Sequence, residues 1–280
     1  MTWLRFIKAL KRNGAFLIMA LQRSNKKKFT PKNLIPPLSI LCGLILWEVL
    51  VGVSQYPEFI LPAPSRILSR FLISVQSGVL LRHTLITLWE VVLGLAVGSS
   101  LALLSGYFLA HHPVVEKIFF PYIIASQAIP MAAIAPLLVI WLGSGIASKV
   151  LICSLTVFFP IQINVIIGLR EIPRNLQDLM KSMRATPQAI LKYLEIPGAL
   201  PVIFGGLRIS STLSVIGAVV GELTGADAGL GYLINTARGQ FDTAMVFVTV
   251  LMLMAIALSL YLLIVLLEKH FLRWQQAKIN

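Results

Sequence analysis

The sequence predicts an all-α polytopic membrane protein with six transmembrane helices. Three observations lead to this: a high hydrophobic content, six apolar windows of helical length, and an uneven distribution of basic residues. Hydrophobic residues make up 57% of the 280 residues and charged residues only 12%, with a mean hydropathy of +0.85. A soluble fold of this length cannot bury so much apolar surface. The hydrophobicity also excludes a disordered chain, and the two cysteines exclude a disulfide scaffold.

Six apolar windows can cross a bilayer as helices, which takes about 20 residues for roughly 30 Å of hydrocarbon. They cover residues 37–53, 87–110, 121–142, 146–169, 201–220 and 244–267. Only Gly143, Ser144 and Gly145 mark the turn between the third and fourth windows. The chain therefore divides into a basic segment (1–36), a transmembrane domain (37–267) and a tail (268–280).

Lysine and arginine set the orientation, because loops rich in these residues stay in the cytoplasm. With the N-terminus inside, nineteen of the 24 basic residues are cytoplasmic, including the nine that precede the first span. The five outside are Arg66, Arg70, Arg82, Lys149 and Arg238. We therefore predict cytoplasmic N- and C-termini and a location in the cell inner (plasma) membrane.

The basic segment 1–36 contains no acidic residue and interleaves apolar with basic side chains. It is interpreted as a surface segment on an anionic leaflet or as a disordered cytoplasmic tail, in preference to a cleaved targeting peptide. Nucleic-acid binding is not needed to explain the charge, because the membrane orientation already accounts for most of it.

Motifs for catalysis or energy coupling are absent from the sequence. It contains no GxxxxGK[ST] phosphate loop, HExxH, CxxC or GxSxG. His111 and His112 are adjacent, so on a helix their side chains point about 100° apart and are poor joint metal ligands. We expect no catalytic residue, no metal site and no cofactor bound by this chain.

Ionisable residues within the predicted spans are few: Glu48, Glu90, Arg208 and Glu222. All lie within about two turns of a predicted membrane face, so we expect their side chains to reach the interface. Because no span carries a central pair of carboxylates, an ion-coupled secondary transporter is the disfavoured alternative. An integral-membrane enzyme is disfavoured as well, because Glu222, Asp227 and Asp242 lack a metal-binding or nucleophilic partner.

Small residues recur at helical spacing on two spans. They include Gly94 and Gly98 in the second span, and Gly217, Gly221 and Gly225 in and after the fifth. Such stripes let helix backbones approach closely. We expect them, together with Glu222, to pack helices or to line a pathway. The polar residues around Gly225 also fit a pore-mouth or re-entrant segment.

The inside loop between the fourth and fifth spans, residues 170–201, is longer than a simple connection requires. Its first half predicts a short amphipathic helix. Thr186 followed by Pro187 then predicts an N-cap and a first helical residue. A second amphipathic helix follows, and we expect Pro197 and Pro201 to end it before the membrane.

Two short helices at a sharp corner would form a docking surface, the alternative being a solvated hairpin that docks nothing. The polar residues presented there are Lys181, Ser182, Arg184, Thr186 and Gln188.

This loop resembles that of the permeases of binding-protein-dependent ABC importers, whose pattern is EAA, three residues, Gly, nine residues and then IxLP. The matching positions are Asp178, Leu179, Met180, Arg184, Leu194, Glu195, Ile196 and Pro197. The spacing and the final proline are kept, the triplet is loosely matched, and Arg184 replaces the glycine. If that glycine serves a left-handed turn, Arg184 implies a locally different corner.

Further segments resemble the nitrate, sulfonate and taurine branch of this family. They are ILPAPS (60–65), IPMAAIAPLLVIWLGSG (129–145) and FFPIQINVIIGLR (158–170). The segment SVIGAVVGELTGADAGLGYLI (214–234) is similar to permeases assigned to riboflavin or to the thiamine pyrimidine precursor.

The resemblance implies a type I ABC importer permease fold and a chain that is not an enzyme. A second permease subunit, expected to form a homodimer, would complete the pathway for a small polar or anionic solute or a vitamin precursor. A periplasmic or lipid-anchored binding protein would deliver that solute. Two separate ATPase subunits would bind ATP and magnesium and dock on the loop, whose coupling residues then also include Asp178, Ala185 and Pro187.

Overall fold

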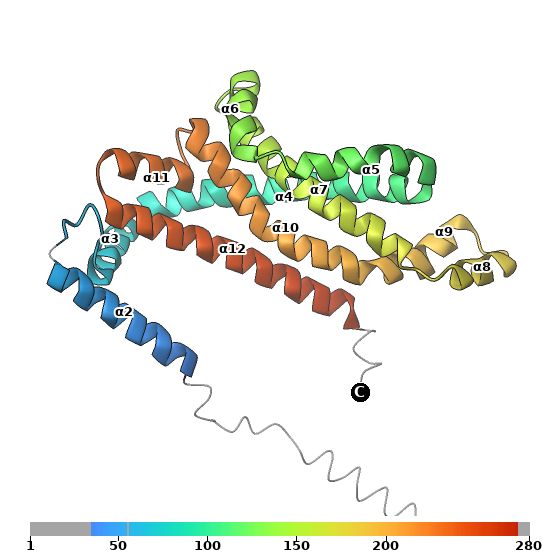
Figure 1. Ribbon diagram of the computed structural model, residues 1–280, viewed down its shortest axis with the longest axis horizontal. Helices are drawn as coiled ribbons and strands as arrows, with labels where there is room; N and C mark the ends of the chain where they lie inside the picture. The colour runs from blue at the N-terminus through green and yellow to red at the C-terminus, as the bar shows by residue number, and fades with distance from the viewer. Residues whose placement is uncertain (1–34, 55, 274–280) are drawn as a thin grey trace, which may run out of the picture. The chain divides into compact units, whose positions relative to one another are not determined.

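The computed structural model describes residues 35–54 and 56–273, and this part of the chain is helical and connected by short turns (Figure 1). The predicted basic segment up to residue 34 and the end of the predicted tail lie outside these residues. The chain divides into two units, Met1–Leu50 and Val51–Asn280. Most of the apolar helix α2 (Ile35–Ser54) belongs to the first unit, and it covers the predicted first span.

The second unit contains the remaining described helices. They are α3 (Pro64–Gln76), α4 (Val79–His111), α5 (Pro113–Gln127), α6 (Met131–Leu142), α7 (Ile146–Arg170), α8 (Arg174–Ser182), α9 (Pro187–Ile190), α10 (Ile196–Gly225), α11 (Leu230–Gly239) and α12 (Thr243–Phe271). Within the described residues, α4, α7, the run from α9 through α10, and α12 are long and apolar enough to cross a membrane. The helices α5 and α6 supply a fifth span if the bent pair is counted as one.

The predicted third span, residues 121–142, is wrong as a continuous helix. The helix α5 ends at Gln127, α6 begins at Met131, and their axes bend by 96°. Pro130 precedes α6 with extended backbone (φ −68°, ψ 116°). Proline has no N–H and disfavours helical backbone at the residue before it, and the extended backbone of Pro130 ends the helical run here, whereas Pro121 and Pro136 lie inside α5 and α6.

The prediction that Pro197 and Pro201 end the second loop helix is also wrong. This helix runs from Pro187 through a π-helical turn, Leu191–Glu195, directly into α10. A π-helical turn is wider than an α-helical one, and it lies just before Pro197, whose ring would crowd the carbonyl four residues earlier in a regular helix. The second half of the loop and the fifth predicted span are therefore parts of one continuous helical run, Pro187–Gly225, called the rod below.

The helix α7 is central to the second unit, because it packs against α4 on one side and α10 on the other. A Cβ on Gly98 of α4 would lie 2.5 Å from Val157 Cγ2, and one on Gly94 would overlap Cys153. On the other side, a Cβ on Gly217 of α10 would lie 3.0 Å from Cys153 Cα. The structure thus places both small-residue stripes where α7 makes close backbone contact with its neighbours.

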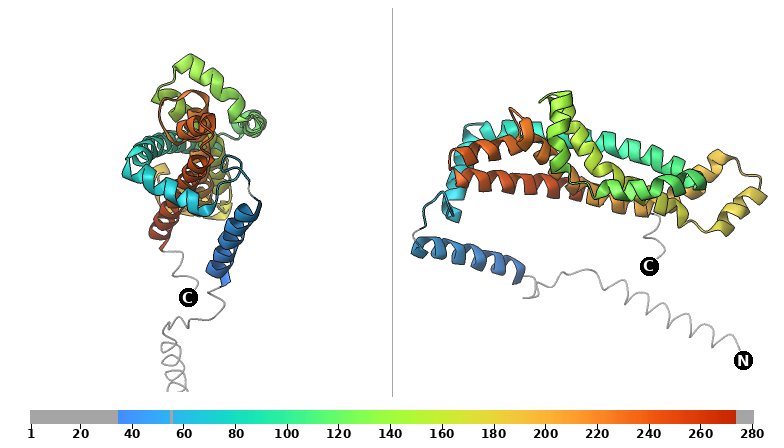
Figure 2. Two further views of the ribbon diagram at one scale, coloured as in Figure 1. Left: turned by 90° about the vertical axis from the view of Figure 1, so that its left-hand side faces the viewer. Right: turned by 45° about the horizontal axis from the view of Figure 1, so that its top comes forward.

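The other glycines of the second stripe also face neighbouring helices. A Cβ on Gly221 would meet Lys149 Cγ at 3.2 Å, and one on Gly225 would meet Val139 of α6 at 2.9 Å. Outside this packing, α12 runs along α10, while α3 and α11 lie at one end of the unit and α8 and α9 at the other (Figures 1 and 2). Two separate polar regions, described below, lie near the two ends of α7.

Candidate functional site

The first polar region is the corner between α8 and α9, residues 183–186, which projects from the end of the second unit (Figure 1). The Ala185 N–H donates to the Met180 carbonyl at 3.0 Å, and the Arg184 N–H donates to the Lys181 carbonyl at 2.9 Å. This pair of hydrogen bonds is the Schellman motif, which ends a helix with one left-handed residue, usually glycine. Arg184 is that residue, with φ +57°.

The expectation that Arg184 implies a different corner is therefore wrong. The backbone keeps the left-handed conformation that glycine would favour, and an arginine adopts it at a steric cost of about 1–2 kcal/mol. The next element begins as predicted, because the Thr186 hydroxyl accepts a hydrogen bond from the Ala189 N–H at 3.3 Å and Pro187 follows it. One helix thus stops and the next starts within four residues.

The helix α8 has two faces of different chemistry. Leu176, Leu179 and Met183 form an apolar stripe with 41%, 54% and 71% of their surfaces exposed, and no residue of α8 is buried. Arg174 and Lys181 point away from this stripe and line a cavity. The predicted docking surface contained only polar and small residues and omitted the apolar stripe, although the helical spacing of its leucines and methionines was a visible signal.

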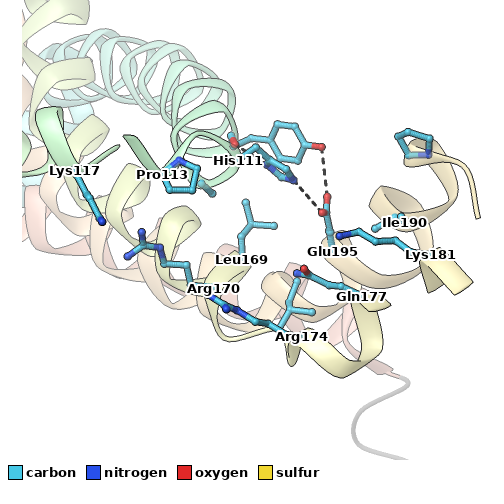
Figure 3. Close-up of a pocket in the computed structure, with 14 residues that line it drawn as sticks. His111, Pro113, Lys117, Leu169, Arg170, Arg174, Gln177, Lys181, Ile190 and Glu195 are labelled. Atoms are coloured by element: carbon cyan, nitrogen blue, oxygen red, sulfur yellow. Dashed lines mark hydrogen bonds and ion pairs between the residues drawn. The ribbon is translucent and has the colours of Figure 1, made fainter. Parts of the chain in front are cut away.

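The remaining residues of the predicted docking surface lie along α8 and the corner. Ala185 is half-buried, whereas the others are exposed: Asp178, Ser182, Arg184, Thr186, Pro187 and Gln188. Lys181 and Pro187 line the cavity shown in Figure 3, whereas the other residues of this surface do not.

The cavity beside α8 has a volume of about 1020 Å³ and lies between the α4–α5 turn, the end of α7, α8 and α9 (Figure 3). On one wall, His111 Nε2 lies 3.0 Å from Glu195 Oε1. The Tyr107 hydroxyl donates to Glu195 Oε2 at 3.4 Å. Because Glu195 belongs to the π-helical turn, these contacts tie the end of α4 to the rod that continues into α10.

The second polar region lies at the other end of α7 and is buried. Glu90 of α4, Lys149 of α7 and Glu222 of α10 are 2%, 5% and 1% exposed. Lys149 Nζ lies 4.0 Å from Glu90 Oε1, and the two carboxyl groups lie next to each other. The prediction that Glu90 and Glu222 reach the interface is therefore wrong, because neighbouring helices cover them.

The sequence shows no central pair of carboxylates on any one span, but the structure brings two carboxyl groups together from two spans. Glu90 and Glu222 come from different helices, so inspection of single spans could not detect that they meet. Arg208, the basic residue predicted to reach the interface alongside these two acids, is less buried than they are. Its side chain lies 3.4 Å from Glu268 of α12 and forms an ion pair with it.

Glu222 holds the start of α11 in place. One of its carboxylate oxygens accepts from the Thr87 hydroxyl at 2.6 Å and the other accepts from the Gly231 N–H. The Leu230 N–H donates to Thr87 Oγ1 at 2.8 Å, and the Gly229 N–H donates to His83 Nδ1 at 2.9 Å. Three successive N–H groups that a helix start leaves unpaired are thereby satisfied, and a carboxylate stands at the positive end of the helix dipole.

Close packing around Glu222 requires glycine at the start of α11. Gly229 has φ +112°, and a Cβ there would overlap the Glu222 carboxylate. Asp242, which the sequence grouped with Glu222, caps α12 instead by accepting from the Met245 N–H at 3.0 Å, and it pairs with Arg70 of α3. Asp227 is exposed. The three acids therefore do not converge on one site.

Comparison with known proteins agrees with this architecture. Residues 94–273 match the family model described as the binding-protein-dependent transport system inner membrane component. The chain is 44% identical, over 85% of its length and 89% of the relative, to the riboflavin transport system permease protein of Chloroflexus aurantiacus. It is 35% identical, over 86% of its length and 96% of the relative, to the formylaminopyrimidine transport permease protein of Halalkalibacterium halodurans.

A solved structure shares the fold. A crystal structure of an amino acid ABC transporter with histidines matches with a TM-score of 0.54 and 17% identity, covering 72% of this chain and 97% of that one. Together these matches confirm the resemblance drawn from the loop pattern and from residues 214–234.

We expect Arg184→Gly to stabilise the α8–α9 corner by about 1 kcal/mol, because glycine adopts a positive φ without steric cost. The measurement is hydrogen–deuterium exchange over residues 176–190, where the Arg184→Gly protein should exchange more slowly. Lys181→Gly is the control, since glycine inside α8 weakens the helix and should speed exchange in the same segment. Faster exchange in the Arg184→Gly protein would contradict the assignment of strain to this residue.

We expect Glu222→Ala to lower stability by about 1–3 kcal/mol, because the Thr87 hydroxyl and the Gly231 N–H would lose a buried acceptor. Thermal unfolding in detergent measures this as a drop in Tm of roughly 2–4 °C per kcal/mol. Glu171→Ala removes an exposed acid at the end of α7 and serves as the control, with a change of about 0.5 kcal/mol or less. Equal Tm values for the two variants would show that the cap contributes nothing.

Proposed function

This chain belongs to the family of binding-protein-dependent transport system inner membrane components, as a permease subunit rather than an enzyme, and we propose that it imports a small solute with energy from two separate ATPase subunits. ATP and magnesium would bind to those subunits. A binding protein outside the membrane would deliver the solute. The positive-inside distribution supports placing the α8 corner in the cytoplasm and the α11 end outside.

The observation that carries this proposal is the exposed apolar stripe of α8. In water, such a stripe gains about 25 cal/mol for each Å² that a partner buries. The Schellman corner and the Thr186 cap hold α8 and α9 in one defined shape, so the stripe is presented for docking rather than as a flexible loop. A groove on an ATPase subunit is the partner that this surface fits.

The connection from the loop to the membrane supports mechanical coupling. The helical run Pro187–Gly225 leads from the α8 corner to the far end of the spanning region, and α7 enters the loop from the other side. When two ATPases close on nucleotide, movement of the docked corner would therefore displace α10 and α7 as rigid elements. Rocking of this kind opens a pathway alternately to the two sides of a membrane.

The break between α5 and α6 is the proposed site of the translocation pathway. Interrupted spans with irregular backbone are typical of substrate sites, because such backbone is tolerated only where protein or water covers it. A cavity of about 210 Å³ lies there, and Ser126, Gln127 and Phe159 are among its lining residues. Ligand sites usually measure about 300–1,000 Å³. The smaller volume fits half of a site that a second copy of the chain completes in a homodimer.

We propose a flat heteroaromatic solute of the riboflavin or aminopyrimidine type as the substrate. Support comes from the identity of 44% and 35% to permeases named for such solutes. The lining agrees in chemistry, because Phe159 offers an aromatic face while Gln127 and Ser126 offer hydrogen bonds.

An ion-coupled carrier is not favoured by the buried acids. A proton relay requires a carboxylate that is free to exchange its partners during the cycle. Glu222 is committed to Thr87 and to the start of α11, and Lys149 lies beside Glu90. The geometry favours a structural role for this cluster.

The coupling proposal predicts that the double variant Leu179→Glu/Met183→Glu loses the ATPase, because two charges would be placed in an apolar groove. Co-purification from membranes measures the ATPase retained, and the variant should still insert. Gln177→Glu is the matched control, since it adds a charge to the cavity face of α8. The purified chain alone should hydrolyse no ATP. Full ATPase retention by the double variant, or hydrolysis by the isolated chain, would reject the scheme.

The substrate proposal predicts that Gln127→Ala raises the KM for riboflavin or formylaminopyrimidine uptake roughly fivefold, through loss of one hydrogen bond of about 1 kcal/mol. Uptake of labelled solute into cells that express the complete transporter provides the measurement. Gln240→Ala, an exposed glutamine at the end of α11, should leave KM unchanged. Uptake of neither solute by the wild type would reject the substrate class while leaving the coupling scheme intact.

A further inference from the structure

The cavity beside α8 carries positive charge that the coupling proposal does not use. Its lining includes Lys117 from α5, Arg170 from α7, and Arg174 and Lys181 from α8 (Figure 3). Lys117 comes from a part of the chain about 50 residues before the other three, which lie in the last turn of α7 and in α8. We call this space the basic cavity. Like charges gathered around one cavity repel one another, and an anion bound among them would offset that repulsion.

Most of this charge is not neutralised within the described part of the chain. Arg170 pairs with Glu116, and the carboxylate of the lining, Glu195, is engaged by His111 and Tyr107. In the same described residues, Lys117, Arg174 and Lys181 have no ion pair with an acidic side chain. Three cations therefore face the cavity without a counterion from residues 35–54 or 56–273.

The size of the cavity indicates what kind of anion it can hold. About 1020 Å³ is far more than a single small ion needs and lies at the upper end of the range for ligand sites. Arg174 supplies a planar guanidinium suited to two phosphate oxygens, while Lys117 and Lys181 supply point charges. The lining therefore suits a phosphate group attached to a larger molecule.

The position of the cavity indicates the source of that phosphate. It lies at the ends of the apolar helices α4 and α7, where lipid headgroups lie if these helices cross a bilayer. Next to Lys117, α5 exposes Val114, Ile118 and Tyr122 at helical spacing, with 73%, 58% and 68% of their surfaces exposed. Such a stripe can contact an acyl chain while the basic residues contact the headgroup.

We propose that the basic cavity binds the phosphate headgroup of an anionic phospholipid from the cytoplasmic leaflet. The inference rests on the orientation given under the proposed function. Basic pockets between spanning helices on the cytoplasmic side are suited to anionic headgroups. A lipid bound here would bridge α5 and α7 to the inner face of α8, and would hold the loop from the side opposite to its apolar stripe.

The test uses the full chain, purified in micelles that contain either phosphatidylglycerol or phosphatidylcholine. The rise in Tm with lipid concentration gives an apparent affinity, because a ligand that binds only the folded state raises stability. Phosphatidylglycerol should raise the Tm more than phosphatidylcholine does. Arg174→Gln/Lys181→Gln should weaken the apparent phosphatidylglycerol affinity roughly 30-fold, about fivefold for each basic residue. This measurement does not need the ATPase, so its outcome is independent of the coupling test.

A matched control separates this site from general attraction to an anionic surface. Lys192→Gln/Lys269→Gln removes the same charge from exposed positions outside the cavity, and its phosphatidylglycerol affinity should equal that of the wild type. Equal weakening in both double variants, or weakening in neither, would overturn the proposal. A third series adds inorganic phosphate without anionic lipid. A Tm rise as large as that with phosphatidylglycerol, lost in Arg174→Gln/Lys181→Gln, would assign the cavity to a soluble phosphate and reject the lipid.

Discussion

The close approach of α7 to α4 and α10 is the constraint on which the rest of the structure depends. In a bilayer no hydrophobic effect drives apolar helices together, so association depends on packing and on interhelical hydrogen bonds. Glycines provide that packing: Gly94 and Gly98 let the backbone of α4 lie directly against α7, and Gly217 does the same for the backbone of α10. Because α7 carries Lys149 near one end and Arg170 at the other, this contact also sets the position of both polar regions.

At the α11 end, the packing buries two carboxyl groups that would otherwise need water. The protein satisfies Glu222 with the Thr87 hydroxyl and with a backbone N–H at the start of α11. This arrangement also removes the unpaired N–H groups that make a helix start costly away from water. A buried acid and a buried helix end, each unfavourable alone, thus stabilise each other. Gly229 is required between them, because a side chain there would displace the carboxylate.

At the α8 end, one short helix presents two chemically different faces. Its apolar stripe faces outward, where an ATPase subunit is proposed to bind, and its basic face lines the cavity proposed for an anionic headgroup. The left-handed conformation at Arg184 sets the direction of α9, and the π-helical turn carries that direction into α10 without a break. The contact of Glu195 with His111 adds a link to α4. The loop is therefore joined to three spanning helices, which the proposed coupling to an ATPase would require.

The sequence by itself determined the membrane class, most of the spans, the first loop helix, the Thr186 cap and the family, because apolar length, capping chemistry and motif spacing are local properties of the chain. It also identified the glycines without deciding between packing and a pathway. Only the tertiary structure showed the bend before Met131, the continuous rod through Pro197, the left-handed Arg184, the meeting of Glu90 with Glu222, and the basic cavity. Whether a proline interrupts a helix depends on how neighbouring turns accommodate it. Charges on separate helices become one site only when packing brings those helices together, and no single segment of the sequence contains that information.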